Sequence, residues 1–172
     1  MRSEEDFHEF VQARGSALSR TAYLLTGDHQ HAEDLVQTAL ARTALRWRRV
    51  VEGGNPEGYV RRVMLNEHIS WWRRRRFTEI HSEAALSDRS VGADESDAVV
   101  WRVALHRALA TLPPRQRAVL VLRFFEDLTE AQTAELMGCS VGTVKSQGHL
   151  ALTRLRAVAP HLLADEHSEV NR

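Results

Sequence analysis

Two stretches of this 172-residue chain hold the side chains best suited to binding chemistry. The first is ISWWRRRRF (69–77), in which two tryptophans precede four consecutive arginines. Indole rings can stack on nucleic-acid bases and guanidinium groups bind phosphates, so the run is typical of a single-strand binding surface. Two other interpretations stay open from the run alone: a solvated helix end, or a basic foot on a membrane surface.

The second stretch is LTEAQTAELMGCSVGTVKSQGHLALTRLR (128–156). Thr129 and Gln132 have the spacing of a capping box, Gly138 is placed to end that helix, and Ser140 to start another. Two helices joined by a short turn that contains glycine form the helix-turn-helix pattern, which reads duplex DNA through the major groove. The alternative is an ordinary helical hairpin with a solvated face.

Helical geometry predicts which side of the second of these helices faces outward. The predicted packing stripe is Val144, Gly148, Ala151, Leu155 and Val158. The residues that point away are Gly142, Lys145, Ser146 and His149. Short and cationic side chains near a helix N-terminus suit groove entry, since lysine and histidine can donate to base or phosphate acceptors.

Helical periodicity predicts the elements that must position these residues. We expect helices over about 4–25, 29–49, 56–76, 98–112 and 115–127, followed by the helix-turn-helix. Asp28 and Asn55 are predicted N-caps, and Pro113-Pro114 a break. The predicted fold is all-α, with two small helical domains (1–77 and 98–160), a flexible acidic linker (78–97) and a short acidic tail (161–172).

Composition excludes several classes of protein. The single cysteine, Cys139, rules out an internal disulfide and a Cys-rich zinc framework, as in a reducing cytoplasm. No apolar run approaches the roughly 20 residues that span a bilayer, so we expect no membrane insertion. We expect neither an enzyme nor a cofactor, because no nucleophile motif or phosphate loop is present. His29, His31, Glu33 and Asp34 do not place three ligands on one helical face, so no metal site is predicted.

Charge alternates along the chain although its formal net charge is zero. Residues 42–76 carry ten basic and three acidic groups, and residues 100–160 carry eight and four. Residues 77–99, between them, carry one basic and six acidic groups. Two basic blocks separated by an acidic connector predict two surfaces that face polyanions.

The segment TLPPRQRAVLVLRFFEDLTEAQTAELMGCSVGTVKSQGHLALTRLR (111–156) closely resembles domain 4 of extracytoplasmic-function (ECF) sigma factors of the sigma-70 family. The stretches AEDLVQTAL (32–40) and NPEGYVRRVMLNEHISWWRRRR (55–76) resemble domain 2 of that family. GDHQHAEDLVQTALART (27–43) and the WWRRR run are similar to its SigE-like actinobacterial branch. The resemblance covers about 150 residues, with both motifs in the expected order.

The resemblance implies a site for each promoter element and for the polymerase. For the melted −10 element it implies Arg62, Asn66, Trp72, Arg73, Arg74 and Arg76. For the duplex −35 element it implies Ser140, Thr143, Lys145, Ser146 and His149. For core RNA polymerase, through its β′ clamp helices, it implies Glu33, Asp34, Leu35 and Gln37. From the residues alone, Asp34 is as well explained as a solvated side chain and Leu35 as a core residue.

The family also binds the β flap of the polymerase, threads its linker along the RNA-exit path, and often has an anti-sigma partner. The acidic linker, with Asp94, Glu95 and Asp97, suits an RNA channel. We therefore expect a cytoplasmic bacterial sigma factor that directs promoter-specific initiation. A stand-alone helix-turn-helix regulator is the alternative. Zero net charge argues against the alternative, because independent DNA affinity comes largely from phosphate neutralisation.

Overall fold

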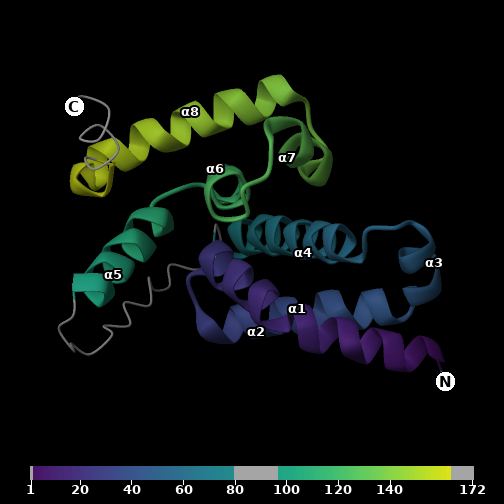
Figure 1. The fold of residues 1–172 in the computed structure, drawn as a ribbon. Helices are drawn as coiled ribbons and strands as arrows, with labels where there is room; N and C mark the ends of the chain where they lie inside the picture. Colours follow the sequence, from purple (N-terminus) through teal and green to yellow (C-terminus); the bar gives the residue numbers. More distant parts are fainter. Residues whose placement is uncertain (1, 80–96, 164–172) are drawn as a thin grey trace, which may run out of the picture.

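The structure is a computed structural model of the chain, and it describes residues 2–79 and 97–163. Every element in these two ranges is helical (Figure 1). The N-terminal unit contains α1 (Arg2–Thr26), α2 (His29–Ala44), α3 (Trp47–Glu52) and α4 (Pro56–Glu79). The C-terminal unit contains α5 (Asp97–Ala110), α6 (Pro114–Leu120), a π-helical turn (Val121–Phe125), α7 (Glu130–Met137), α8 (Val141–Val158) and a 3₁₀ turn (Pro160–Leu163). The linker residues 80–96, which include Asp94 and Glu95, lie outside the described ranges, as does the tail from 164.

Local capping sets where the helices of the N-terminal unit begin. Gly27 takes a positive φ of 71° after α1, a conformation that favours glycine. Asp28 then accepts a hydrogen bond from the His31 backbone N–H at 2.8 Å, as predicted. Asn55 does the same for Gly58 at 2.9 Å. These caps satisfy backbone donors that the first turn of a helix leaves without partners.

The predicted single helix over 29–49 is wrong, because the chain leaves helical geometry after Ala44 and starts α3 at Trp47. At the break Arg46 adopts φ −126° and ψ 15°. The bend places the Trp47 ring 5.1 Å from that of Phe7 and 5.2 Å from that of Phe10, both on α1. Aromatic packing at a distant position in the sequence therefore decides this boundary, which neither glycine nor proline marks.

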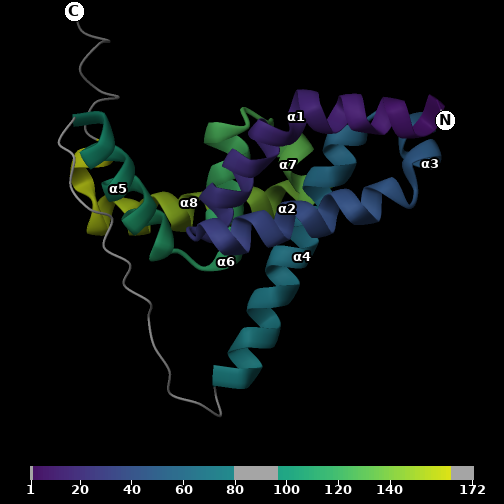
Figure 2. The same cartoon turned by 90° about the horizontal axis from the view of Figure 1, so that it is seen from below.

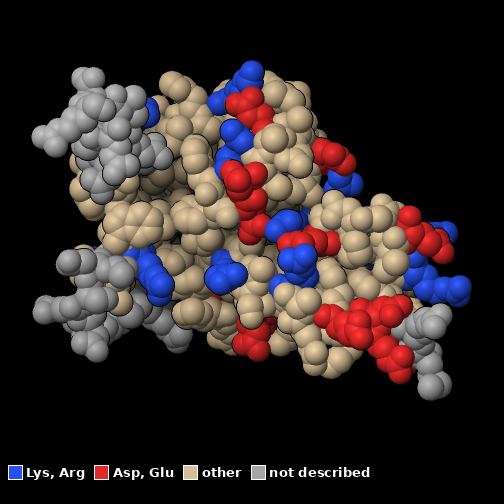
Figure 3. All heavy atoms as spheres, in the orientation of Figure 1, with Lys and Arg blue, Asp and Glu red and all other residues tan. Residues whose placement is uncertain are grey.

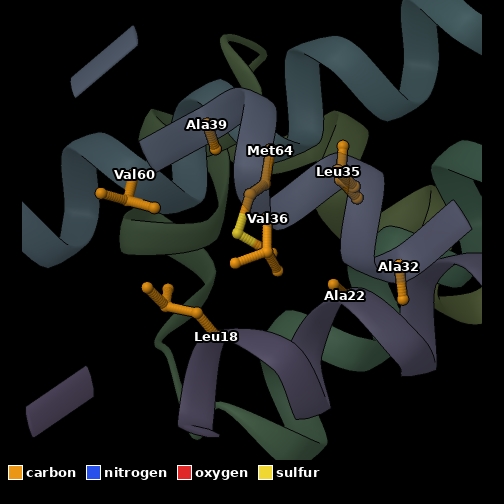
Figure 4. Close-up of a cluster of buried hydrophobic side chains, with 8 residues drawn as sticks. All are labelled: Leu18, Ala22, Ala32, Leu35, Val36, Ala39, Val60 and Met64. Carbon is orange, nitrogen blue, oxygen red and sulfur yellow. The ribbon is translucent and has the colours of Figure 1, made fainter. Parts of the chain in front are cut away.

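The core of the N-terminal unit lies where α1, α2 and α4 meet (Figure 4). It contains Leu18, Ala22, Ala32, Leu35, Val36, Ala39, Val60 and Met64, all buried. The small alanines let the helices approach, while Met64 and Leu18 fill the space between them. This core fixes α4 against the other two helices, and so fixes which face of α4 points outward.

The helix-turn-helix is formed by α7 and α8, as the sequence predicts. Both halves of the capping box between Thr129 and Gln132 are present. Gly138 ends α7 in the left-handed conformation at φ 62°, and Ser140 caps α8. In the predicted packing stripe of α8, Val144, Ala151 and Leu155 are buried and Gly148 is half-buried, but Val158 is 52% exposed. That assignment was wrong because α8 ends there, and Ala159 and Leu162 of the next turn cover the core instead.

A π-helical turn interrupts the helix that begins at Pro114. Within it the Glu126 N–H donates to the Val121 carbonyl at 3.0 Å, a five-residue step in place of the α-helical four. Glu126 follows directly as the residue that ends the turn. The sequence predicted an uninterrupted helix over 115–127, so the turn is a correction to that prediction.

The two units pack against each other. Leu25 of α1 and Leu65 of α4 share one buried cluster with Ala118, Val121 and Leu122 of the C-terminal unit. In Figure 1, α6 lies end-on between α8 above and α1, α2 and α4 below. Within the described ranges, no helix is long and apolar enough to cross a membrane.

Candidate nucleic-acid and polymerase interfaces

The C-terminal half of α4 projects away from the other helices (Figure 2). It carries the tryptophan–arginine run, and Arg73, Arg74 and Arg76 are all exposed. Trp71 packs on His31 of α2, with ring centroids 4.0 Å apart. Trp72 is half-buried and meets Trp71 edge-on at 5.5 Å. Within the run, the Trp71 ring is therefore held against α2, while Arg73, Arg74 and Arg76 form an exposed cationic end.

Arg75, which was not among the predicted site residues, lies over both rings. Its guanidinium carbon is 5.1 Å from the Trp71 centroid and 6.0 Å from that of Trp72. Stacking of this kind suits the planar, weakly hydrated guanidinium group. Arg75 therefore packs on the ring pair, while Arg73, Arg74 and Arg76 are exposed.

Asn66 and Arg62 lie one turn apart on α4, on the face opposite its buried residues. Asn66 is exposed. Arg62 is engaged with α7: its Nη2 donates to the Glu135 carbonyl at 3.2 Å and lies 3.5 Å from the Glu135 carboxylate. Part of the predicted −10 face is thus in contact with the C-terminal unit.

A cleft of about 390 Å³ opens beside this contact, between α3, α4 and α7. Four arginines line it, together with polar and apolar groups; the arginines are Arg46, Arg49, Arg61 and Arg62. Figure 3 shows basic and acidic side chains side by side over the middle of the same face. Sequence reasoning missed Arg46, Arg49 and Arg61 as site residues. The signal that could have found them was the basic excess of residues 42–76.

The outward face of α8 is free of packing contacts to the core. Lys145, Ser146 and His149 are all exposed, as predicted. Lys145 lies 3.7 Å from the Glu130 carboxylate at the start of α7. An exposed pair of this kind is worth less than about 1 kcal/mol, so a phosphate can readily displace it.

Ser140 and Thr143 hold the N-terminal end of α8. Ser140 Oγ accepts from the Thr143 N–H at 3.1 Å, and the two hydroxyls lie 2.9 Å apart. Ser146 in turn donates to the Thr143 carbonyl at 3.0 Å. These contacts fix the end of the helix that carries Lys145 and set the direction of its side chains.

The predicted polymerase-binding residues of α2 divide between surface and core. Glu33, Asp34 and Gln37 are exposed, and Gln37 donates to Glu33 at 3.2 Å. Leu35 is only 4% exposed and packs in the core of the N-terminal unit. Its assignment to a contact surface is corrected here, because a helical residue adjacent to Asp34 points about 100° away from it, toward α1 and α4.

Buried cationic and imidazole groups cluster where the two units meet. His68 of α4 is fully buried, and desolvation lowers its pKa to about 3, with His31 and Arg117 acting in the same direction. Burial also lowers the pKa of His106 on α5. Arg117 of α6 is 5% exposed, and burial lowers its pKa to about 10. At neutral pH the histidines are therefore uncharged and Arg117 is charged.

The described residues contain no group of three histidine, cysteine, aspartate or glutamate side chains that could hold a metal ion. His29 stacks on Tyr23 at 4.1 Å and His31 on Trp71, so both rings serve packing.

Comparison with known proteins agrees with this geometry. Residues 10–78 match the family model for Sigma-70 region 2, and residues 102–155 match that for Sigma-70, region 4. The RNA polymerase sigma-E factor of Streptomyces avermitilis is 43% identical over 88% of this chain and 83% of that protein. The ECF RNA polymerase sigma factor SigL of Mycobacterium tuberculosis is 31% identical over 94% and 90%.

A solved structure extends the likeness to the whole fold. The sigma factor RpoE from Bartonella quintana, in complex with the anti-sigma factor NepR, has a TM-score of 0.71 and 25% identity, covering 98% of this chain and 99% of that one. The region 2 match spans most of α1 to α4, and the region 4 match runs from α5 to the last turn of α8. This chain belongs to the ECF group of the sigma-70 family and is an RNA polymerase sigma factor.

Proposed function

We propose that promoter reading is divided between the outward faces of α4 and α8. On α4, Asn66, Arg62 and Arg73 contact the melted −10 strand, and Trp72 stacks on one of its bases. Arg74 and Arg76 bind the phosphates of that strand. Single-strand binding requires cations along a path and planar groups for stacking, and this helix presents both. The observation that carries the proposal is the exposed Asn66–Arg73 face on a helix within the region 2 match.

On α8, Lys145, Ser146 and His149 enter the major groove of the −35 element. Ser140 and Thr143 lie at the helix end closest to the DNA backbone. The N-terminus of a helix favours phosphate through its backbone donors and its dipole. What supports this assignment is that the outward side chains of α8 are exposed while Val144, Ala151 and Leu155 hold its other face in the core.

We infer that α2 docks on core RNA polymerase through Glu33, Asp34 and Gln37. An exposed acidic helix surface suits a basic partner surface, and such pairing mainly sets orientation and association rate. Leu35 supports this surface from inside. The protein itself catalyses nothing: the polymerase makes the RNA, in the bacterial cytoplasm. The domain limits proposed for these tasks are 1–77 and 98–160.

The solved relative is bound to an anti-sigma factor. We propose a regulator of the same kind for this chain. Co-purification of the tagged chain from its own host, with identification of the bound proteins by mass spectrometry, tests that proposal; recovery of RNA polymerase subunits alone would contradict it.

The decisive experiment is reconstitution with core polymerase and a promoter library. Transcripts that start at defined promoters only when this protein is added support the proposal. Tight duplex binding by the isolated chain without any transcript supports a stand-alone regulator instead. Within this assay Asn66→Ala should lower open-complex yield by more than closed-complex formation. Open complexes at wild-type level would remove Asn66 from the −10 site. Arg20→Ala, an exposed change on α1, is the control.

A further inference from the structure

We propose that the arginine-lined cleft between α3, α4 and α7 binds a free nucleotide, a nucleoside di- or triphosphate. The phosphates bind Arg46 and Arg49 of α3, and the base lies against Tyr59 of α4. The inference adds a small-molecule site to the proposed function. It does not rest on that function, because none of these three residues is assigned to DNA or to the polymerase.

The cleft holds more positive charge than the protein neutralises. One carboxylate lines it, that of Glu135, and this group lies 3.5 Å from Arg62. Arg61 binds two further carboxylates, one from α4 and one from the end of the π-helical turn. In the part of the chain that the structure describes, no acidic side chain pairs with the other two arginines, Arg46 and Arg49. These two leave positive charge available to an anion.

Trp47 holds the arginine pair in position. Its ring is buried against α1, and Val50 of the same helix is buried as well. Arg46 and Arg49 are three residues apart, so they lie on one face of α3 and line the cleft together. Arg48 is exposed and does not line this cleft. Two guanidinium groups at this spacing can each bind two oxygens, which suits a chain of phosphates.

The uncharged polar groups of the cleft leave donors available. The amide oxygens of Asn55 and Gln132 each accept from a backbone N–H at the start of a helix, at 2.9 Å and 2.8 Å. Among the described residues, neither amide nitrogen has an acceptor. The Nε of Arg61 is buried and also has no acceptor within those residues. Because a buried donor without a partner costs free energy, the site suits a ligand rich in acceptor oxygens and ring nitrogens.

The apolar part of the cleft suits a base. Tyr59 is half-buried and lines the cleft together with Val50, Leu128 and Leu136. Aromatic rings stack on bases of any kind, and small-molecule sites combine apolar walls with a few polar groups. The volume of about 390 Å³ lies in the range of such sites, and it suits one nucleotide better than a strand of several. Inorganic phosphate would leave the apolar wall without a partner.

Isothermal titration calorimetry of the full-length chain tests the site, with ATP, GTP and inorganic tripolyphosphate as probes. At least one of the two nucleotides should bind with a Kd below about 0.1 mM. Arg46→Gln/Arg49→Gln should weaken that binding about tenfold or more, because charge-assisted contacts to phosphate are lost. Arg20→Gln/Arg48→Gln removes the same charge at exposed positions outside the cleft, and it should bind the nucleotide as the wild type does.

Tyr59→Leu tests the position of the base. It should weaken nucleotide binding about fivefold or more, because a stacking contact is lost, and leave the binding of tripolyphosphate unchanged. Tripolyphosphate that binds the wild type as tightly as the nucleotides do would show a general attraction of anions and would overturn the proposal. The proposal is also overturned if neither nucleotide binds, or if the arginine variant and its control bind with equal affinity.

A DNA strand is the other source of the same chemistry. If a single-stranded oligonucleotide of mixed sequence binds through the arginine pair while neither free nucleotide binds, the cleft belongs to the DNA path and the proposal is wrong. If the double variant does not fold, Arg49→Gln alone should weaken nucleotide binding about threefold or more. Transcription with core polymerase is scored separately. A wild type that binds the nucleotide but does not initiate at promoters contradicts the proposed function and leaves the nucleotide site supported.

Discussion

The burial of His68 makes the fold sensitive to acid. In the folded chain its pKa is about 3, whereas in the unfolded chain a histidine titrates near 6.5. Above the unfolded value both states are neutral, and the histidine adds no pH dependence. As the pH falls below it, the unfolded state takes up a proton that the folded state refuses, so stability is lost continuously until the folded pKa is reached.

The size of the effect follows from that difference. At about pH 5 the unfolded imidazole is mostly protonated, and the loss of stability is about 2 kcal/mol, at roughly 1.4 kcal/mol for each pH unit. Urea unfolding at about pH 7.5 and about pH 5 measures it. His68→Leu removes the titrating group and fills similar space. Between about pH 7.5 and about pH 5, the free energy of unfolding of this variant should therefore fall by about 2 kcal/mol less than that of the wild type. Burial also lowers the pKa values of His31 and His106, which adds to the loss in both proteins.

The control is His8→Leu, a change at an exposed ring near the start of α1. It should follow the wild-type pH dependence. The reasoning about His68 is refuted if His68→Leu and the wild type lose equal stability between the two pH values, because the buried ring would then be protonated in both states.

Two further predictions follow from packing and charge. Trp47→Ala should destabilise the chain by about 3–5 kcal/mol, since the ring is 7% exposed and packs on Phe7 and Phe10. Thermal unfolding measures the loss, and Leu45→Ala, at a side chain that is 87% exposed, is the control. A loss of stability below about 1 kcal/mol in the Trp47 variant would contradict the prediction. Lys145→Ala should lower transcription from −35-dependent promoters and reduce the salt dependence of promoter binding by about one phosphate contact, without changing affinity for core polymerase; equal loss on promoters without a −35 element would point to a folding defect instead.

Local signals in the sequence predicted the helices and their caps well. Asp28, Asn55, Thr129 and Ser140 each cap a helix through a contact three residues away, and that spacing is visible in the sequence. The outward face of α8 was also predictable, because helical geometry fixes it once the helix is known.

Long-range contacts decide what the sequence left open. In the sequence Arg117 is one more basic residue of a basic block, yet it is buried, and its Nε–H donates a hydrogen bond to the Leu24 carbonyl, far away in the sequence. Leu35 was assigned to a partner surface, but the core of the N-terminal unit takes it. The periodicity of apolar residues predicts which face of a helix is buried, but it does not predict which other helix packs on that face.

The π-helical turn determines the direction in which the Glu126 side chain points. It contains one residue more than an α-helical turn would need, immediately before Glu126. If the same residues continued as a plain α-helix, Phe125 would take the place of Glu126 on the Val121 carbonyl, and Glu126 would lie about 100° further round the helix axis. Its carboxylate would then face away from Arg61 of α4, which it binds in the structure. The extra backbone residue in the π-helical turn therefore sets the direction in which Glu126 meets α4, independent of which side chains the turn carries.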